Sequence, residues 1–319
     1  NWASDTKNTT TRGLLEKTAK VDRQAELPKF HGKTFARQAK AAPAPLNREA
    51  PAFGRKVALY ATCFVNYNNP ATGMAAQAVL AKNGVQSTVV YPACCGMPQF
   101  EQGDLARVAE RAKSVAKAFE PWLDKGHDVV ALTPSCALML KFEWPLLLPD
   151  DPLVKRLANA TYDITEYVVD IAQKEGLAPG LKPLDGQVAL HIACHARAQN
   201  MGNKATEMMK LVPATKVTQI LRCSGHGGSW GIFKGNFETA LKIGKPAYRQ
   251  AGQIGKEAAK AAAAEGGNAP AKTYLSSECP LAGTHLRQGL ERLEMEGKPE
   301  FVESPHPIEL FARAYGLSY

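Results

Sequence analysis

Cysteine is the residue of this chain whose chemistry and placement together point to a site, because seven cysteines follow short apolar segments. Four belong to the first half of the chain and three to the second: Cys63, Cys94, Cys95 and Cys136, then Cys194, Cys223 and Cys279. A thiolate is both a ligand for soft metals and a nucleophile. An odd number of cysteines, in a chain without a secretory signal, argues against a disulfide framework. The pattern therefore favours metal ligands or reactive thiols.

The first-half cysteines supply four sulfurs, the number that an iron–sulfur cluster or a structural zinc site requires. Soft sulfur ligands alone do not decide between these metals. Cys94 and Cys95 are neighbours, and adjacent side chains of an extended backbone point in opposite directions. Both can reach one centre only if the chain turns there, and Gly96 permits such a turn. We predict a four-thiolate centre made by Cys63, Cys94, Cys95 and Cys136.

The second half offers only three cysteines, because Ser224 stands where the first half has Cys95. A histidine, His226 or His195, could supply a fourth ligand. Such a set suits zinc, a cluster with one replaced ligand, or an iron open to substrate. In the alternative interpretation each histidine is a hydrogen-bonded structural side chain. The predicted metal ligands of this half are Cys194, Cys223, Cys279 and His226, and the candidates for a catalytic role are Cys194, Cys223, His195 and His226.

Six short runs rich in β-branched residues each lead into a cysteine and are followed by longer helical stretches. These predicted strands span residues 56–63, 87–95, 128–136, 187–194, 216–223 and 272–279. Strands that alternate with helices predict a parallel sheet with helical crossovers. Ligands of such sheets gather at the carboxyl ends of the strands, so the cysteines of each half are expected to converge on one crevice. Helices predicted just after Cys136 and Cys279 would favour thiolate over thiol.

The two halves read as copies of one α/β domain. The second cysteine follows the first by 31 residues in the first half and by 29 in the second, and the third follows by 73 and 85. The turn Cys94-Cys95-Gly96-Met97 corresponds to Cys223-Ser224-Gly225-His226. Residues 237–265 are predicted to form a helix without a chemical role. We expect an N-terminal arm at 1–55, a first lobe at 56–180 and a second lobe at 181–319.

With 45% hydrophobic and 22% charged residues among 319, the chain has the composition of a globular protein. It contains no apolar run long enough for a membrane-spanning helix, and the expected compartment is the cytoplasm. The formal charge of +9 is spread among acidic residues without basic runs, so no nucleic-acid partner is expected. The charge fits solubility, an acidic protein partner or an anionic membrane surface. Because the sequence opens with Asn1 and its first methionine is Met74, we expect a further segment upstream.

The motifs of this chain resemble the cysteine-rich CCG-domain family, which includes a subunit of heterodisulfide reductase, a subunit of anaerobic glycerol-3-phosphate dehydrogenase and the iron–sulfur subunit of glycolate oxidase. The resemblance covers nearly the whole chain from residue 56. It is carried by Cys63 followed 31 residues later by Cys94-Cys95-Gly96, by Pro134-Ser135-Cys136, by Cys194-His195-Ala196-Arg197, and by Cys223-Ser224-Gly225-His226-Gly227-Gly228.

The resemblance implies two Rossmann-like lobes related by a pseudo-twofold repeat, and iron–sulfur electron transfer within a flavin-linked, often membrane-associated complex. It also implies an upstream ferredoxin-like module with two cubane clusters. Family members that build a noncubane cluster carry a further cysteine three positions after the third strand end, where this chain has Met139 and Ala282. This departure favours a four-thiolate centre, expected as a 4Fe-4S cluster, in the first lobe, with zinc or a second iron–sulfur centre in the second.

Three functions follow as hypotheses. In the first, the chain is an iron–sulfur electron-transfer subunit of an oxidoreductase, passing electrons between a flavoprotein or other redox subunit and a quinone or disulfide acceptor. In the second, the second-lobe site itself reduces a disulfide. In the third, zinc stabilises a scaffold without redox activity. The expected location is cytoplasmic, with peripheral attachment to the inner membrane as the variant.

Overall fold

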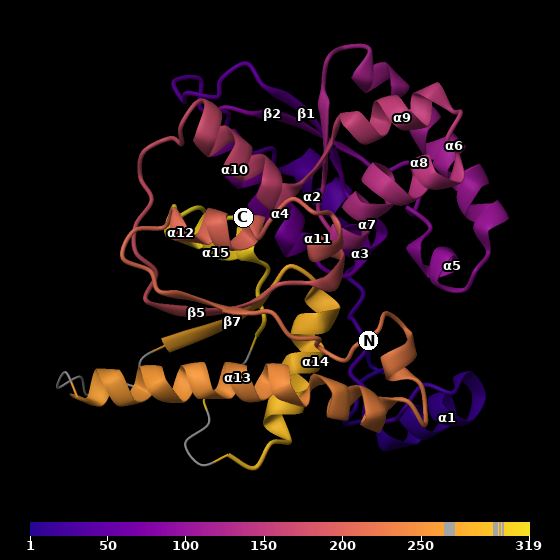
Figure 1. Ribbon diagram of the computed structural model, residues 1–319, viewed down its shortest axis with the longest axis vertical. Helices are drawn as coiled ribbons and strands as arrows, with labels where there is room; N and C mark the ends of the chain where they lie inside the picture. The colour runs from indigo at the N-terminus through magenta and orange to yellow at the C-terminus, as the bar shows by residue number, and fades with distance from the viewer. Residues whose placement is uncertain (265–271, 296–298, 300, 302) are drawn as a thin grey trace. The chain divides into compact units, whose positions relative to one another are not determined.

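The structure is a computed structural model that describes residues 1–264, 272–295, 299, 301 and 303–319 (Figure 1). The chain divides into two compact units, which we treat separately. The three-stranded unit comprises Asn1–Phe30, Leu184–Ala193 and Ala214–His306. The four-stranded unit comprises His31–Pro183, Cys194–Pro213 and Pro307–Tyr319. The lobe boundaries expected at residues 55 and 180 stay a prediction.

The four-stranded unit is built on a parallel sheet with the strand order β2-β1-β3-β4. Its strands are β1 (Lys56–Tyr60), β2 (Gln86–Val90), β3 (Asp128–Ala131) and β4 (Thr161–Asp163). The register places Tyr60 of β1 beside Val90 of β2 and Ala131 of β3. Two long helices make the crossovers from β1 to β2 and from β2 to β3, namely α4 (Pro70–Lys82) and α6 (Leu105–Leu123), and a third, α10 (Ile164–Lys174), follows β4.

Shorter helices complete this unit, and in Figure 1 α9 packs beside α6. They are α2 (Phe35–Ala41), α3 (Cys63–Tyr67), α5 (Met97–Glu101), α7 (Pro134–Leu138), a π-helix (Met139–Glu143), α8 (Trp144–Leu147), α9 (Pro152–Asn159), α11 (Cys194–Ala198), α12 (Lys204–Lys210) and α15 (Pro307–Ala314). The core lies between the sheet and α6, where Phe119 packs edge-on against Tyr60 with ring centroids 5.6 Å apart.

The three-stranded unit has a parallel sheet in the order β6-β5-β7. Its strands are β5 (Gly186–His191), β6 (Val217–Ile220) and β7 (Lys272–Ser277). Its helices are α1 (Thr9–Ala19), a short 3₁₀ helix (Trp230–Ile232), α13 (Phe237–Ala264) and α14 (Pro280–Glu291). In both sheets the first strand of the set lies between the second and the third. The predicted α/β class with short parallel sheets is confirmed.

The strands are shorter than the sequence predicts, since each ends two to five residues before its cysteine. The cysteines instead occupy turns and first helical residues. Cys63 and Cys194 begin α3 and α11, and α7 starts at Pro134, ahead of Cys136 rather than after it. The predicted helix at 237–265 corresponds to α13, and residue 265 lies outside the described residues. Among the described helices, none combines the length and apolarity that a membrane crossing requires.

Candidate metal centre

Four cysteines from three loops of the four-stranded unit lie together in the structure. We call Cys63, Cys94, Cys95 and Cys136 the four-thiol group. Its sulfurs form two close pairs, with 3.6 Å between Cys63 Sγ and Cys94 Sγ and 3.1 Å between Cys95 Sγ and Cys136 Sγ. The first pair is partly exposed and the second is buried. The four first-half cysteines of the sequence analysis therefore meet at the end of the sheet where the strands terminate.

Hydrogen bonds that use no sulfur atom hold these three loops against one another. Thr62 Oγ1 and Thr133 Oγ1 lie 3.1 Å apart, joining the loop of Cys63 to the loop of Cys136. Tyr60 Oη donates to the carbonyl oxygen of Ala93 at 2.7 Å, and Trp144 Nε1 donates to that of Cys95 at 3.2 Å. These side chains are almost completely buried, so the bonds are shielded from water. The sulfurs are thus positioned by a framework of oxygen and nitrogen contacts.

The backbone turns sharply at two points of the site. Thr62 has φ of 54°, which is uncommon for a β-branched residue, and its hydroxyl accepts the N–H of Val65 at 3.2 Å. Gly96 has φ of 88°, and its N–H points at Cys94 Sγ at 3.5 Å. The turn at Gly96 explains how the adjacent residues Cys94 and Cys95 can both join the group. Cys94 faces Cys63, while Cys95 faces Cys136. Such conformations concentrate at functional sites.

Close packing makes the four thiols electrostatically unequal. The pKa of Cys94 is lowered, because the Cys63 and Cys95 thiols and the Gly96 N–H donate hydrogen bonds to its sulfur. The pKa of Cys63 is raised, first by its hydrogen bond to Cys94 and then by burial. The pKa of Cys95 is raised by its bonds to Cys136 and Cys94 and by burial. Arg111 adds a positive charge that further favours thiolate at Cys94.

The donor set of the four-thiol group fits a soft metal or an iron–sulfur cluster, because it consists of four sulfurs without competing hard ligands. In the described residues no three His, Cys, Asp or Glu side chains already have the arrangement of a site for a metal ion. The sulfurs of Cys95 and Cys136 lie 3.1 Å apart, whereas two thiolates bound to one zinc ion stand roughly 3.8 Å apart. Binding requires the thiols to lose their protons and separate.

The three-stranded unit repeats this framework with other residues. His191, three positions before Cys194 as Tyr60 is before Cys63, places Nε2 3.1 Å from the carbonyl oxygen of Arg222. Its Nδ1 lies 2.9 Å from Ser277 Oγ. One imidazole therefore ties β5 both to the end of β7 and to the residue before Cys223. This explains His191 as a structural side chain.

The turn after β6 matches the turn after β2. Gly225 has φ of 81°, and its N–H points at Cys223 Sγ at 3.3 Å. Ser224, in the place of Cys95, accepts the N–H of His226 through its Oγ at 3.4 Å. The backbone that presents Cys94 is therefore built again at Cys223, with a hydroxyl in place of the second thiol.

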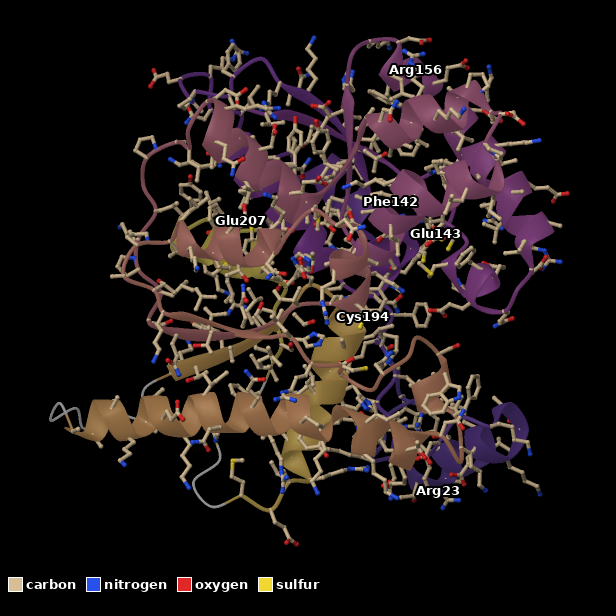
Figure 2. All side chains as sticks on the ribbon, in the orientation of Figure 1. Arg23, Phe142, Glu143, Arg156, Cys194 and Glu207 are labelled. Carbon is tan, nitrogen blue, oxygen red and sulfur yellow. The ribbon has the colours of Figure 1, made fainter. Side chains whose placement is uncertain are left out.

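The second-half site residues are distributed between the two units. Cys223 is exposed in its loop, and Cys279 is half-buried at the residue before α14, both in the three-stranded unit. Cys194 is exposed at the start of α11 in the four-stranded unit, as Figure 2 shows. The set of Cys194, Cys223, Cys279 and His226 therefore stays a prediction.

The two histidines proposed as fourth ligands differ in their surroundings. His226 is buried, with its ring 5.7 Å from that of His285, and burial followed by the charge of His285 lowers its pKa to about 4. His195, on α11, is half-buried, and burial lowers its pKa as well. Both imidazoles are therefore held neutral near pH 7, the protonation state in which a histidine can bind a metal.

Sequence reasoning missed the residues that support the site, namely Tyr60, Thr62, Thr133 and Trp144. One signal was available, since Tyr60 and His191 both stand three residues before the first cysteine of their half and both can donate a hydrogen bond. Met139, three residues after Cys136, is fully buried at the start of the π-helix whose Phe142 and Glu143 are labelled in Figure 2. It adds no thiol to the group.

Comparison with known proteins places these features in a family. The cysteine-rich CCG domain matches residues 57–141. The chain is 28% identical over 249 residues to a subunit of the anaerobic glycerol-3-phosphate dehydrogenase of Escherichia coli K12, covering 77% of this chain and 61% of that protein. It is 32% identical over 188 residues to lactate utilization protein A of Bacillus pumilus, covering 56% of this chain and 75% of that protein. A third relative, lactate utilization protein A of Macrococcus caseolyticus, is 30% identical over 189 residues.

The matched domain contains the whole four-thiol group and three of the residues that tether it, Tyr60, Thr62 and Thr133. The same family is therefore indicated by the sequence motifs, by the loops that carry the sulfurs and by the similarity to the relatives. On these grounds the chain belongs to the cysteine-rich CCG-domain family.

Proposed function

We propose that this chain is an iron–sulfur electron-transfer subunit of an oxidoreductase. The observation that carries the proposal is the four-thiol group, in which four sulfurs from three loops meet, two of them buried and two partly exposed. Cys63, Cys94, Cys95 and Cys136 would hold the cluster, taken as 4Fe-4S. A bound cluster supplies a one-electron carrier whose potential depends on burial and on hydrogen bonds to sulfur.

The residues around the sulfurs suit this role. Burial of Cys95 and Cys136 keeps water from one side of the centre, while half-exposed Cys63 and Cys94 leave a side from which electrons can enter or leave. The N–H of Gly96 and the charge of Arg111 both stabilise negative sulfur at Cys94. These contacts would raise the reduction potential of a bound cluster relative to a bare thiolate site.

The relatives support a place in a multi-subunit redox system. One is a subunit of an anaerobic dehydrogenase and others are lactate utilization proteins. For this chain we propose a flavoprotein or other redox subunit as donor and a quinone or a disulfide as acceptor. We further propose a cytoplasmic location, with peripheral contact to the inner membrane.

Anaerobic purification of the full chain, followed by measurement of iron, acid-labile sulfide and zinc, tests the proposal. We expect about four irons per chain for a 4Fe-4S centre, visible absorbance, and a paramagnetic signal in one of its redox states. Colourless protein with stoichiometric zinc would instead select the zinc-stabilised scaffold.

A matched pair of variants assigns the centre to one set of cysteines. Cys94→Ser should remove the iron, whereas Cys223→Ser, at the equivalent turn of the three-stranded unit, should leave the first-lobe iron in place. Iron lost equally from both variants would contradict the assignment to the four-thiol group. The same pair reveals whether the second lobe holds zinc or a second iron–sulfur centre.

One observation favours a second function, disulfide reduction at the second-lobe site. Cys223 is exposed, so its sulfur is accessible to a substrate, and the Gly225 N–H donates to that sulfur at 3.3 Å. Reduction of a disulfide to two thiols consumes two electrons, which the redox partner would supply, and two protons from solvent, which His195 or His226 would relay. Turnover that survives Cys223→Ser and Cys194→Ser unchanged would eliminate this function.

A further inference from the structure

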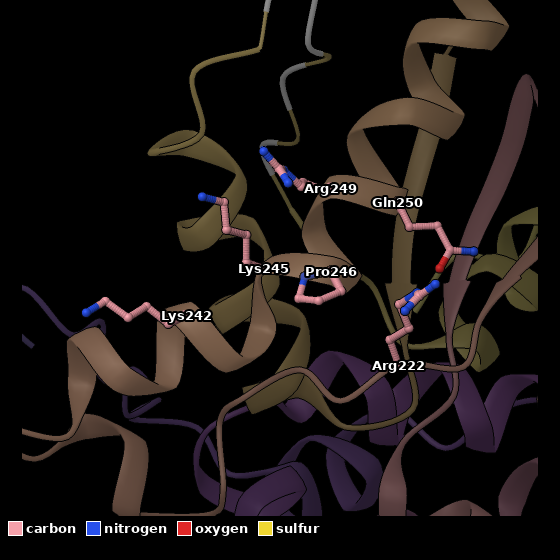
Figure 3. Close-up of a pocket in the computed structure, with 6 residues that line it drawn as sticks. All are labelled: Arg222, Lys242, Lys245, Pro246, Arg249 and Gln250. Carbon is pink, nitrogen blue, oxygen red and sulfur yellow. The ribbon is translucent and has the colours of Figure 1, made fainter.

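A basic groove lies in the three-stranded unit, outside the four-thiol group. It has a volume of about 450 Å³ and is lined by Arg222, Lys242, Lys245, Pro246, Arg249 and Gln250. Figure 3 shows five of these side chains along α13 and Arg222, from the loop after β6, next to Gln250. We call it the basic groove.

The basic groove concentrates positive charge without matching carboxylates. Its four cationic residues are exposed, and none forms an ion pair with a carboxylate in the part of the chain that the structure describes. Other cations of the chain are matched, such as Arg55, which lies 2.8 Å from both Asp170 and Glu175. Like charges lining one concave surface produce a local positive potential. The basic groove is therefore suited to an anionic group.

The basic groove is fixed in position relative to Cys223. A Cβ on Gly225 would stand 2.0 Å from the carbonyl oxygen of Ala240, and one on Gly244 would stand 2.2 Å from that of Ser224. Two glycines thus let the backbone of the Cys223 loop pack directly on α13. Gln250 Nε2, on the next turns of the helix, donates to the carbonyl oxygen of Gln219 in β6 at 3.1 Å. Whatever binds the basic groove is held beside Cys223, which directly follows Arg222.

Apolar side chains accompany the cations. Leu221, next to Arg222, is 46% exposed, and Ile243, between Lys242 and Lys245, is 47% exposed. Apolar residues and arginine are common in protein interfaces, whereas small-molecule sites are concave pockets that bury most of their ligand. The combination favours a protein surface as the occupant.

We propose that the basic groove docks the acidic face of a redox partner protein and so brings the partner's electron carrier next to Cys223. This inference rests on the proposed electron-transfer function, because that function gives the docking its purpose. The binding itself depends only on charge and shape. Aspartate and glutamate side chains of the partner would pair with the arginine and lysine side chains while an apolar rim covers Leu221 and Ile243.

Fluorescence anisotropy with a labelled ten-residue glutamate peptide tests the docking surface on the full, anaerobically prepared chain at low ionic strength. We expect saturable binding that weakens with added salt as surface charges are screened. The triple variant Lys242→Glu, Lys245→Glu and Arg249→Glu should weaken binding at least about tenfold. The triple variant Lys242→Gln, Lys245→Gln and Arg249→Gln should weaken it by less, and it covers the case in which charge reversal prevents folding.

A control triple variant separates local from overall charge. Lys17→Glu, Lys20→Glu and Lys216→Glu change the net charge equally at exposed positions of the same unit and should alter binding less than about threefold. Equal weakening by both sets would overturn the proposal. So would displacement of the peptide by inorganic phosphate at equal charge concentration, or groove-dependent binding to phosphatidylglycerol vesicles in place of the peptide.

Iron content measured on the same samples distinguishes the two proposals. If the peptide binds through the basic groove but the chain holds no iron, docking survives and the electron-transfer function fails. If iron is present but the groove variants bind the peptide as well as the unmodified chain, docking fails and the electron-transfer function stands.

Discussion

Two turns of this molecule share one backbone and differ in what surrounds their sulfur. After β2, the chain passes through Cys94, Cys95 and Gly96, and after β6 it passes through Cys223, Ser224 and Gly225. Both glycines have positive φ, and both point their N–H at the sulfur two residues earlier. Yet the first turn presents one half-buried and one buried thiol, whereas the second presents a single exposed thiol.

The comparison distinguishes the backbone that positions a cysteine from the surroundings that determine how its thiol is used. The repeated backbone shows what any cysteine at this position needs, which is a sharp turn and an N–H donor. The environment decides how the thiol is used, because burial and sulfur neighbours favour a metal centre, while exposure and a serine favour contact with a partner or substrate. Each prediction below changes one side of the comparison.

The largest effect is expected from exchanging the residues that distinguish the two turns. Cys95→Ser gives the first turn the composition of the second and should abolish the iron proposed for the first lobe, because the variant lacks a proposed buried thiolate ligand. Ser224→Cys, the reverse exchange, should leave that iron unchanged. Iron analysis and paramagnetic resonance check both variants. A Cys95→Ser protein that retains a full cluster would show that Cys95 is not a ligand.

Gly225 and Gly96 should differ in their tolerance of a methyl group. Gly96→Ala requires only the left-handed backbone, since its Cβ would meet nothing closer than 3.6 Å, and it should cost about 1–2 kcal/mol of unfolding free energy. Gly225→Ala adds a clash at 2.0 Å with Ala240 and should cost about 3 kcal/mol or more. Denaturant unfolding of both variants measures the difference. Equal losses would mean that α13 does not pack closely on the Cys223 turn.

Acid should weaken the three-stranded unit through its buried histidine His306. Burial lowers the pKa of His306 to about 3, below the value near 6.5 of an unfolded chain. The stability that depends on a neutral His306 is complete above about pH 6.5. It is lost as the pH falls toward 3, by about 1.4 kcal/mol per pH unit, so the free energy of unfolding is about 2 kcal/mol lower at pH 5. Unfolding curves at pH 7 and pH 5 should show this loss, and His306→Gln should reduce it. The exposed His31 provides the control, His31→Gln, which should leave the slope unchanged.

The last prediction concerns Tyr60 and His191, the side chains that support the two turns through hydrogen bonds. Tyr60→Phe removes one hydrogen bond and leaves the buried carbonyl of Ala93 without its donor, which should cost about 1–3 kcal/mol. His191→Phe removes two such bonds, and its loss should be the larger of the two. Denaturant unfolding measures both losses. A larger loss of unfolding free energy in Tyr60→Phe than in His191→Phe would show that the two side chains are equivalent in position but not in their contribution to stability.

The sequence predicted the α/β class because the cues were local and repeated. β-branched runs followed by helical stretches mark crossovers, and the first residues of β1, β3 and β7 agree with the predicted strands. The ends of the strands were wrong for a physical reason. The run Tyr60-Ala61-Thr62 remains apolar or β-branched up to Cys63, but Thr62 leaves the strand to bond with Thr133, 71 residues away. β4, only three residues long, gave no pattern at all.

The candidate site, like the fold, was predicted only in part from the sequence. That four first-half sulfurs meet follows from strands that end at one edge of a sheet. The sequence could not predict the hydrogen bonds that support the cysteine loops, since Ala93 and Cys95 accept them through backbone carbonyl groups, which every residue carries. Nor did the sequence show that Cys194 belongs to a different compact unit from Cys223 and Cys279, because that division depends on packing rather than on spacing.

The tethers of the four-thiol group have a consequence for how the protein matures. Since Thr62, Thr133, Tyr60 and Trp144 act through oxygen and nitrogen atoms, they can form in a chain that has received no iron. Folding would then precede loading, and a delivery factor would meet Cys63 and Cys94 at the surface before Cys95 and Cys136 beneath them. For the proposed centre, the order in which the sulfurs are engaged would thus follow their depth below the surface.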